Sequence, residues 1–273
     1  MLAAISILNI FLPLGYTVTA FFYGRAFLKG DEFADKHKSN FLSLTLFMHF
    51  LSSALRTAEF RHIPVTSFYE LMGMLALTIS AAYLFIEFST KVRNTGFPIL
   101  AICTVLVLLD SLFYKQYYGV QDVLKSELLA FHVIAALVGY SSFTLSAVYG
   151  FLYVILYKKL RSKTFDTVYQ NLPSLESLEK LANKGIIIGF IALAFSIVIG
   201  FIWLPRAIES FSKADAQFIG VFLTLVVYGV GISVIKFAGL RGRRLALLAV
   251  IGFIVMCISV IFANTFTGFH NFR

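Results

Sequence analysis

Two of the five histidines in this sequence occupy positions from which they could ligate the same metal ion. His132 lies near the start of a long apolar stretch, and His270 follows the last apolar stretch of the chain. Neutral imidazoles are ligands of haem iron and of other transition metals. The cysteines, Cys103 and Cys257, form no CxxC or CxxCH pattern. The sequence therefore indicates neither a redox pair nor covalent haem attachment.

The composition indicates that these histidines belong to a membrane protein. Hydrophobic residues make up 59% of the 273 residues and charged residues only 14%, whereas soluble domains carry about 25% charged residues. Apolar runs of about twenty residues recur, and each could cross a hydrocarbon core of about 30 Å. No soluble segment separates them, so residues 1–273 are expected to form a single transmembrane domain. The first run lacks a basic leader and is interpreted as a helix, not a signal peptide.

The apolar runs predict an all-α fold, a polytopic integral membrane bundle of about eight transmembrane helices. The predicted helices cover residues 2–25, 41–60, 66–88, 96–114, 127–157, 185–204, 217–237 and 245–267. A short amphipathic helix at the membrane interface is also expected within 158–184. Leucines recur there at helical spacing, at Leu172, Leu175, Leu178 and Leu181.

The distribution of positive charge predicts the orientation of the bundle. Formal net charge is +9, and the basic residues cluster in alternate connections, including the RGRR turn at Arg241 to Arg244. This pattern follows the positive-inside rule, so it indicates membrane topology and not nucleic-acid binding. Both termini are then extracytoplasmic, and His132 and His270 lie at about the same depth near the outer face. The RGRR turn is a topology anchor that also suits anionic lipid.

Helical spacing places His132 on one face with Gly139, Phe143, Ser146 and Gly150. Small residues and an aromatic ring beside an imidazole could accommodate a flat macrocycle, and two facing histidines could supply both axial ligands of a haem. Ser142, Ser146 and Gly150 also form a small-xxx-small series that favours close helix approach. The alternative is that each histidine is only an amphipathic side chain at the membrane interface.

Charged residues within or beside the apolar runs require partners or solvent. Arg56, Glu59 and Glu70 could pair with one another and close the hairpin of the second and third helices. Arg56 could instead bind haem propionates, because arginine suits bidentate carboxylate contacts. Asp110 and Glu87 lie near predicted helix ends, where solvation at the interface is expected. His37 is expected in a solvated loop among lysines.

Several stretches resemble the cytochrome c assembly family of haem-handling membrane proteins. HFLSSALRTAEFRHIPVTSFYE, from His49 to Glu70, is similar to a family pattern that ends in Tyr-Glu. The matching positions are His49, Arg56, His62, Pro64, Tyr69 and Glu70. HVIAALVGYSSFTLSAVYGFLY from His132 and the segments from Leu172, Leu240 and Asn264 are also similar to family segments. The resemblance is strongest to CcsA-like members, and the chain looks like a divergent one, closer to the accessory HemX-like or YpjD-like proteins than to a full synthase.

The resemblance implies a haem site on the outer face, ligated by two histidines that correspond to His132 and His270. It implies a non-covalent b-type haem, with His49, His62 and Glu70 as a secondary set. The family's tryptophan-rich motif is missing, because WLPRAIESFSKADAQF stands in its place. Trp203 and Arg206 of this stretch are the residues that could still cover a haem. Ser233 stands near the place of a further membrane histidine of the family.

Three function classes follow. The first is a haem-binding protein of the cytoplasmic membrane that acts in c-type cytochrome biogenesis or haem handling. The resemblance limits it to one component of a haem lyase, with a CcsB-like partner or an apocytochrome c. The second is a non-catalytic membrane scaffold or regulator that associates with another membrane protein complex. A transporter or channel has less support, because no inverted repeat or broken helix is evident.

Overall fold

The computed structural model describes residues 1–90, 92, 94–115, 126–207 and 216–267, with side chains at all of these except 203–207, 216–218 and 263–267. Every regular element within these ranges is a helix, and there are nine of them. The chain divides into two compact units, which are described separately. Unit 1 comprises Met1–Gly119 and Leu156–Ser174, and unit 2 comprises Val120–Ile155 and Leu175–Arg273. The single domain expected from the sequence stays a prediction.

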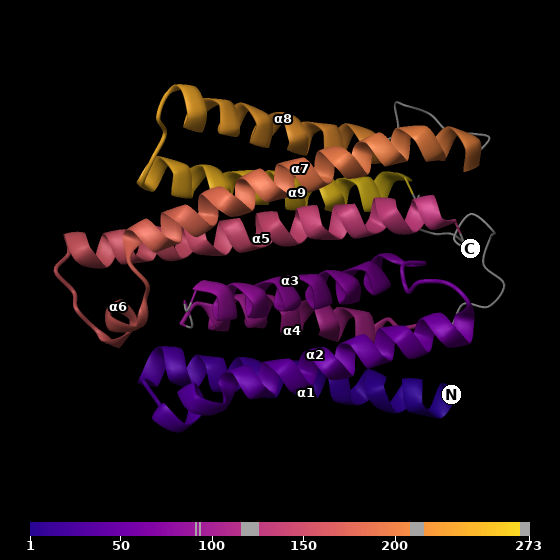
Figure 1. Cartoon of the computed structure of the whole chain (residues 1–273), viewed down its shortest axis with the longest axis horizontal. Helices are drawn as coiled ribbons and strands as arrows, with labels where there is room; N and C mark the ends of the chain where they lie inside the picture. The colour runs from indigo at the N-terminus through magenta and orange to yellow at the C-terminus, as the bar shows by residue number, and fades with distance from the viewer. Residues whose placement is uncertain (91, 93, 116–125, 208–215, 268–273) are drawn as a thin grey trace. The chain divides into compact units, whose positions relative to one another are not determined.

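Unit 1 is built from two helical hairpins. Its helices are α1 (Leu2–Lys29), α2 (Glu32–Phe60), α3 (Phe68–Thr90), α4 (Gly96–Leu112) and the short α6 (Thr167–Asn171). Helix α1 packs against both α2 and α4, and α3 packs against α4 (Figure 1). The side chain of Asn171 donates to the carbonyl of Phe27 at 2.8 Å, which fixes α6 against the end of α1.

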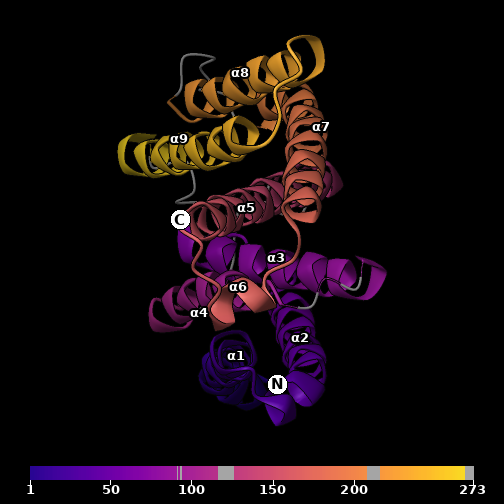
Figure 2. The ribbon, with the colours of Figure 1, turned by 90° about the vertical axis from the view of Figure 1, so that its left-hand side faces the viewer.

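Unit 2 contains most of the long helix α5 (Glu127–Arg161) together with α7 (Leu175–Ala207), α8 (Ala216–Phe237) and α9 (Arg243–Thr267). Helices α8 and α9 form a hairpin, and α7 contacts both of them. Figure 2 shows α5 and α8 on opposite sides of unit 2, with α7 and α9 between them. The connection between α8 and α9 contains Gly239 and Gly242, both at φ 63°. Glycine adopts this left-handed conformation without steric cost.

The apolar faces of these helices point outward, which identifies a membrane helical bundle. Six of the described helices are long and apolar enough to cross a membrane: α1, α3, α5, α7, α8 and α9. Helix α4 is a shorter apolar helix. Large apolar side chains such as Phe50, Phe85 and Phe222 are exposed, whereas Arg56, Glu70 and Asp110 are buried. This arrangement suits a lipid solvent, because only polar groups need to be enclosed. The predicted all-α membrane bundle is confirmed for the described residues.

Two sequence predictions about helix boundaries are wrong. Helix α2 begins at Glu32, so His37 lies in a helix and its Nδ1 hydrogen-bonds the carbonyl of Phe33 at 2.9 Å. The cause is an Asp31 cap that starts the helix early. A short helix, α6, lies within the stretch 158–184 where an interfacial helix is expected, but the leucines from Leu175 onward form the first turns of α7 instead. Burial of Leu178 in unit 2 explains their helical spacing.

Close approach of α5 to α7 and α9 depends on small residues. A Cβ added at Gly185 of α7 would lie 2.8 Å from the carbonyl oxygen of Ser142 and 2.8 Å from the Cβ of Ser146. One added at Gly150 would lie 2.7 Å from the carbonyl oxygen of Ala246 in α9. The small-xxx-small series therefore brings helices together as predicted.

We expect Gly185→Ala to destabilise the folded protein by about 1–3 kcal/mol, because the new methyl group would overlap the backbone of α5. The measurement is the free energy of unfolding in detergent micelles. Gly15→Ala is the matched control, since a Cβ there would meet Thr45 at an ordinary contact distance of 3.4 Å. Equal stability of the two variants would contradict the packing argument.

The N-terminus of α2 carries a pH-dependent cap. The Asp31 carboxylate accepts a hydrogen bond from the backbone N–H of Ala34 at 3.0 Å and lies 2.5 Å from the Arg25 guanidinium. The Ala34 N–H, together with Arg25, holds the pKa of Asp31 below its usual range. Because the folded state favours the carboxylate, its contribution to stability is present above about pH 4 and is lost as pH falls through the folded pKa.

We expect the unfolding midpoint of the natural protein to fall more steeply below about pH 4 than that of Asp31→Asn. An asparagine keeps a capping oxygen but cannot titrate. The measurement is a thermal unfolding series in detergent from neutral to acidic pH. Parallel pH profiles would show that this carboxylate contributes nothing.

Candidate functional site

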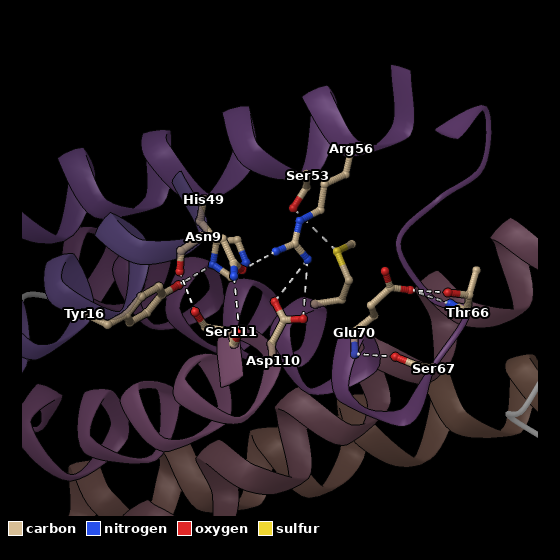
Figure 3. Close-up of polar contacts among 11 residues, drawn as sticks. Asn9, Tyr16, His49, Ser53, Arg56, Thr66, Ser67, Glu70, Asp110 and Ser111 are labelled. Atoms are coloured by element: carbon tan, nitrogen blue, oxygen red, sulfur yellow. Dashed lines mark hydrogen bonds and ion pairs between the residues drawn. The ribbon is translucent and has the colours of Figure 1, made fainter. Parts of the chain in front are cut away.

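The interior of unit 1 contains an ion pair between Arg56 of α2 and Asp110 of α4 (Figure 3). Nη1 of Arg56 lies 3.3 Å from Oδ2 and 3.4 Å from Oδ1 of Asp110, and the two side chains are 6% and 5% exposed. The Asp110 carboxylate fits only because α3 has a glycine beside it. A Cβ at Gly73 would lie 2.5 Å from Oδ2 of Asp110.

Helix α1 joins this ion pair through Asn9. The Arg56 Nη2 donates to Oδ1 of Asn9 at 2.8 Å, and the Asn9 amide donates to the carbonyl of Ser111 at 3.2 Å. The Ser111 hydroxyl donates back to the Asn9 carbonyl at 2.5 Å. Three helices are thus connected by one buried arginine and its partners. Asn9 was not singled out from the sequence, although an amide in an otherwise apolar first helix was a usable signal.

A second part of the network is centred on His49. The Tyr16 hydroxyl lies 2.9 Å from Nδ1 of His49 and 2.8 Å from Oγ of Ser80, and it connects α1, α2 and α3. The Ser80 hydroxyl also donates to the carbonyl of Ala76 at 2.6 Å. All three side chains are buried, so Tyr16, His49 and Ser80 depend on protein partners and not on solvent for their hydrogen bonds.

Glu70 caps α3 and does not pair with Arg56. Its Oε2 accepts from the backbone N–H of Thr66 at 2.8 Å and from the Thr66 hydroxyl at 2.5 Å. The Ser67 hydroxyl accepts from the Glu70 N–H at 3.2 Å, which resembles a capping box. A carboxylate at a helix N-terminus is also favoured by the helix dipole. The ion pair expected to close the hairpin of the second and third helices is instead made with α4.

One cavity in unit 1 is lined by side chains that include His49, Arg56, Pro64, Glu70 and Asp110. Its volume is about 10 Å³, close to that of a single water molecule. The Nε–H of Arg56 has no hydrogen-bond acceptor among the described residues. The segment singled out from His49 to Glu70 therefore converges on one polar pocket.

The expectation that Asp110 and Glu87 are solvated at the interface is wrong. Asp110 is buried in the ion pair with Arg56, and Glu87 is 1% exposed. The Glu87 carboxylate accepts from the Tyr23 hydroxyl at 2.7 Å and from the Ser39 hydroxyl. Position near a helix end did not predict exposure, because neighbouring helices extend past these residues and enclose them.

In unit 2, His132 of α5 is held by Ser196 of α7. Its Nδ1 lies 2.8 Å from the Ser196 carbonyl oxygen and 3.1 Å from the Ser196 hydroxyl. The hydroxyl also donates to the His132 carbonyl at 2.9 Å. Gly200 borders the ring, since a Cβ there would lie 3.1 Å from Cε1. Ser196 and Gly200 were not identified from the sequence, because only the packing of α5 on α7 brings them to the histidine.

The other predicted site residues are distributed as follows. Phe143 is fully buried, stacks on Tyr228 with ring centroids 3.7 Å apart, and borders Gly189 of α7. His62 is buried, with Nδ1 2.9 Å from the carbonyl of Ile63. His270 lies outside the described residues, as do the side chains of Trp203 and Arg206. Within the described part of the chain, no group of three or more His, Cys, Asp or Glu could hold a metal ion.

These features define a class of multi-span helical membrane proteins that enclose ionisable side chains and orient a histidine near one end of a helix. The family model of the cytochrome C assembly protein matches residues 65–270. The chain therefore belongs to the cytochrome c assembly family, as the sequence resemblance predicted.

Relatives with similarity over most of the chain include HemX and CcsA proteins. HemX of Bacillus subtilis (strain 168) is 28% identical over 266 residues, which cover 94% of each chain. HemX of Brevibacillus brevis is 27% identical and covers 78% of this chain and 81% of its own. The cytochrome c biogenesis protein CcsA of Prochlorococcus marinus (strain MIT 9312) is 26% identical, with 77% and 76% covered. The chain is a divergent CcsA-like and HemX-like member of the family.

We expect Asp110→Asn to destabilise the protein by about 3–5 kcal/mol, because it leaves the charge of Arg56 buried without a counter-ion. The double variant Arg56→Gln with Asp110→Asn should recover part of this loss. The measurement is a double-mutant cycle on the free energy of unfolding in detergent. Asp166→Asn is the control, since Asp166 pairs with Lys159 at an exposed site and should change little. Additive effects of the Arg56 and Asp110 variants would contradict the coupling.

Proposed function

We propose that the protein binds a non-covalent b-type haem and acts in c-type cytochrome biogenesis or haem handling. Membership of the cytochrome c assembly family supports this role, as does similarity to the cytochrome c biogenesis protein CcsA. The observation that carries the proposal is the orientation of His132. Its hydrogen bonds with Ser196 leave one specific ring nitrogen as the ligand.

The donor chemistry of His132 fits an axial ligand. A carbonyl oxygen can only accept, so the 2.8 Å contact with Ser196 places the proton of the neutral ring on Nδ1. Nε2 then carries the lone pair, and the backbone carbonyl fixes the direction of the ring. Metal-ligating histidines are usually held in this way by a carbonyl or carboxylate on the other nitrogen.

His270 is proposed as the second axial ligand, with Trp203 and Arg206 covering the macrocycle. A bound haem would supply a redox-active iron at this end of unit 2. Phe143 supports the site from inside the helix packing, since its ring stacks on Tyr228. We do not extend the set to Arg56, because its guanidinium already donates to Asp110 and Asn9.

The proposal includes an orientation and a location. The bundle has about eight transmembrane helices in the cytoplasmic membrane, with both termini and the haem site on the extracytoplasmic side. Residues 1–273 act as one membrane domain, and a CcsB-like membrane protein or an apocytochrome c is the partner. His49, His62 and Glu70 remain a secondary set, of which His49 and Glu70 line the same cavity.

A non-catalytic scaffold or regulator is the second candidate. One observation favours it: the face of α5 that contains Gly139, Phe143 and Gly150 is packed against other helices and leaves no surface for a macrocycle. It predicts a colourless protein that copurifies with another membrane protein.

We expect the purified protein, supplied with haem, to show the reduced absorption spectrum of a b-type haem. His132→Ala and His270→Ala should each abolish or shift this spectrum, because each removes an axial ligand. His37→Ala is the control, since His37 bonds only to its own helix in the described part of the chain. A spectrum unchanged in both ligand variants would refute the assignment, and no signal in the natural protein would favour the scaffold.

Gly200→Val tests the positioning of His132 without removing a ligand. A side chain at this position would overlap the imidazole, so we expect weaker haem retention and a shifted reduction potential. The conservative change Gly200→Ala should have a smaller effect of the same sign. Unchanged haem spectra in a folded Gly200→Val protein would show that the ring is not held from α7.

A further inference from the structure

Unit 2 has a long apolar groove along α8, with a wall contributed by α7. Its volume is about 720 Å³. Lining residues include Phe190 of α7 and Val226, Gly229, Val230, Ser233 and Phe237 of α8. From Leu225 to Phe237 the groove follows α8 for about 18 Å, at 1.5 Å per residue. One leaflet of a bilayer has an apolar thickness of about 15 Å, so the groove could hold a whole acyl chain.

Glycine sets the depth of this groove. A Cβ at Gly229 would lie 3.2 Å from Cε2 of Phe190, so the small residue already packs against α7 within the chain. The Ser233 hydroxyl donates to the Gly229 carbonyl at 2.9 Å and offers no hydrogen to a partner. Gly229 and Ser233 could favour packing of a partner helix, but both already make contacts within this chain. The rest of the lining is apolar.

Positive charge gathers at one end of the groove. Lys236 lies beside the lining residue Phe237, with Nζ 5.7 Å from the centre of its ring. Arg241 lies in the turn that follows, Arg243 and Arg244 begin α9, and each of these four basic residues is exposed. The backbone N–H of Gly242 donates to Glu179 of α7 at 2.9 Å, which fixes the turn against α7. Glu179 supplies one negative charge among these positive ones.

We propose that this groove is a binding site for one anionic phospholipid. An acyl chain occupies the groove between Val226 and Phe237, and the phosphate headgroup lies against Lys236 and the arginines of the turn. Charge complementarity supports this occupant, because basic residues near a membrane surface attract anionic headgroups. The proposal is independent of haem binding, since no residue that lines the groove is a proposed haem ligand.

The test is native mass spectrometry of the full chain in detergent with equal amounts of phosphatidylglycerol and phosphatidylcholine of the same acyl chains. We expect the natural protein to retain one phosphatidylglycerol in preference to phosphatidylcholine. Val230→Trp should fill the groove and lower retention of both lipids. Val198→Trp is the matched control on α7, because Val198 is 55% exposed and Val230 is 59% exposed, and Val198 is outside the groove lining.

A separate variant tests the contact with the lipid headgroup. Arg241→Gln with Arg244→Gln should reduce the preference for phosphatidylglycerol by about 30-fold and leave an acyl chain in the groove. Arg161→Gln, at the end of α5, is the control. Equal retention of the two lipids by the natural protein, or equal effects of Val230→Trp and Val198→Trp, would overturn the proposal. A dimer that Val230→Trp dissociates would also overturn it, because the occupant would then be a second copy.

Discussion

The ion pair between Arg56 and Asp110 is the interaction on which unit 1 depends. A charge inside a membrane bundle must be enclosed and paired, and these two residues are satisfied only when α1, α2, α3 and α4 are all in place. Asn9 brings α1 to the arginine, and Gly73 opens the space beside α3 for the carboxylate. The pair therefore specifies which helices are neighbours, while the apolar outer faces interact with lipid and specify little.

Unit 2 is organised by close backbone contact and not by charge. Gly185 and Gly150 allow α5 to approach α7 and α9 so closely that an added methyl group would overlap a neighbour. This contact has a chemical result, because it places the Ser196 carbonyl against Nδ1 of His132. The same packing that builds the helix pair thus selects the tautomer of the histidine.

The structure confirms the sequence predictions best where a prediction depends only on neighbouring residues along the chain. Each predicted transmembrane run corresponds to a helix, and six of the described helices are long and apolar enough to cross a membrane. This agreement arises because about twenty consecutive apolar residues suit lipid whatever their neighbours are. Agreement ends where a residue's environment comes from distant segments. The positions of Asp110 and Glu87 near helix ends predict solvation, yet other helices enclose both side chains. The spacing of the leucines from Leu175 onward shows that one helix face is buried, but it does not show which helix they belong to or against what they pack.

The sequence by itself determined the class of the protein and the presence of its long helices. It also identified the segment from His49 to Glu70 as a candidate site. Composition and periodicity are local properties, so they are readable without a structure. Only the tertiary structure decided that His49, Arg56 and Glu70 share one pocket, that Asp110 is the partner of Arg56, and that Ser196 orients His132. Such contacts join residues up to about a hundred positions apart, as Asn9 and Ser111 are. They exist only once helix packing has fixed which polar groups must satisfy one another inside the membrane.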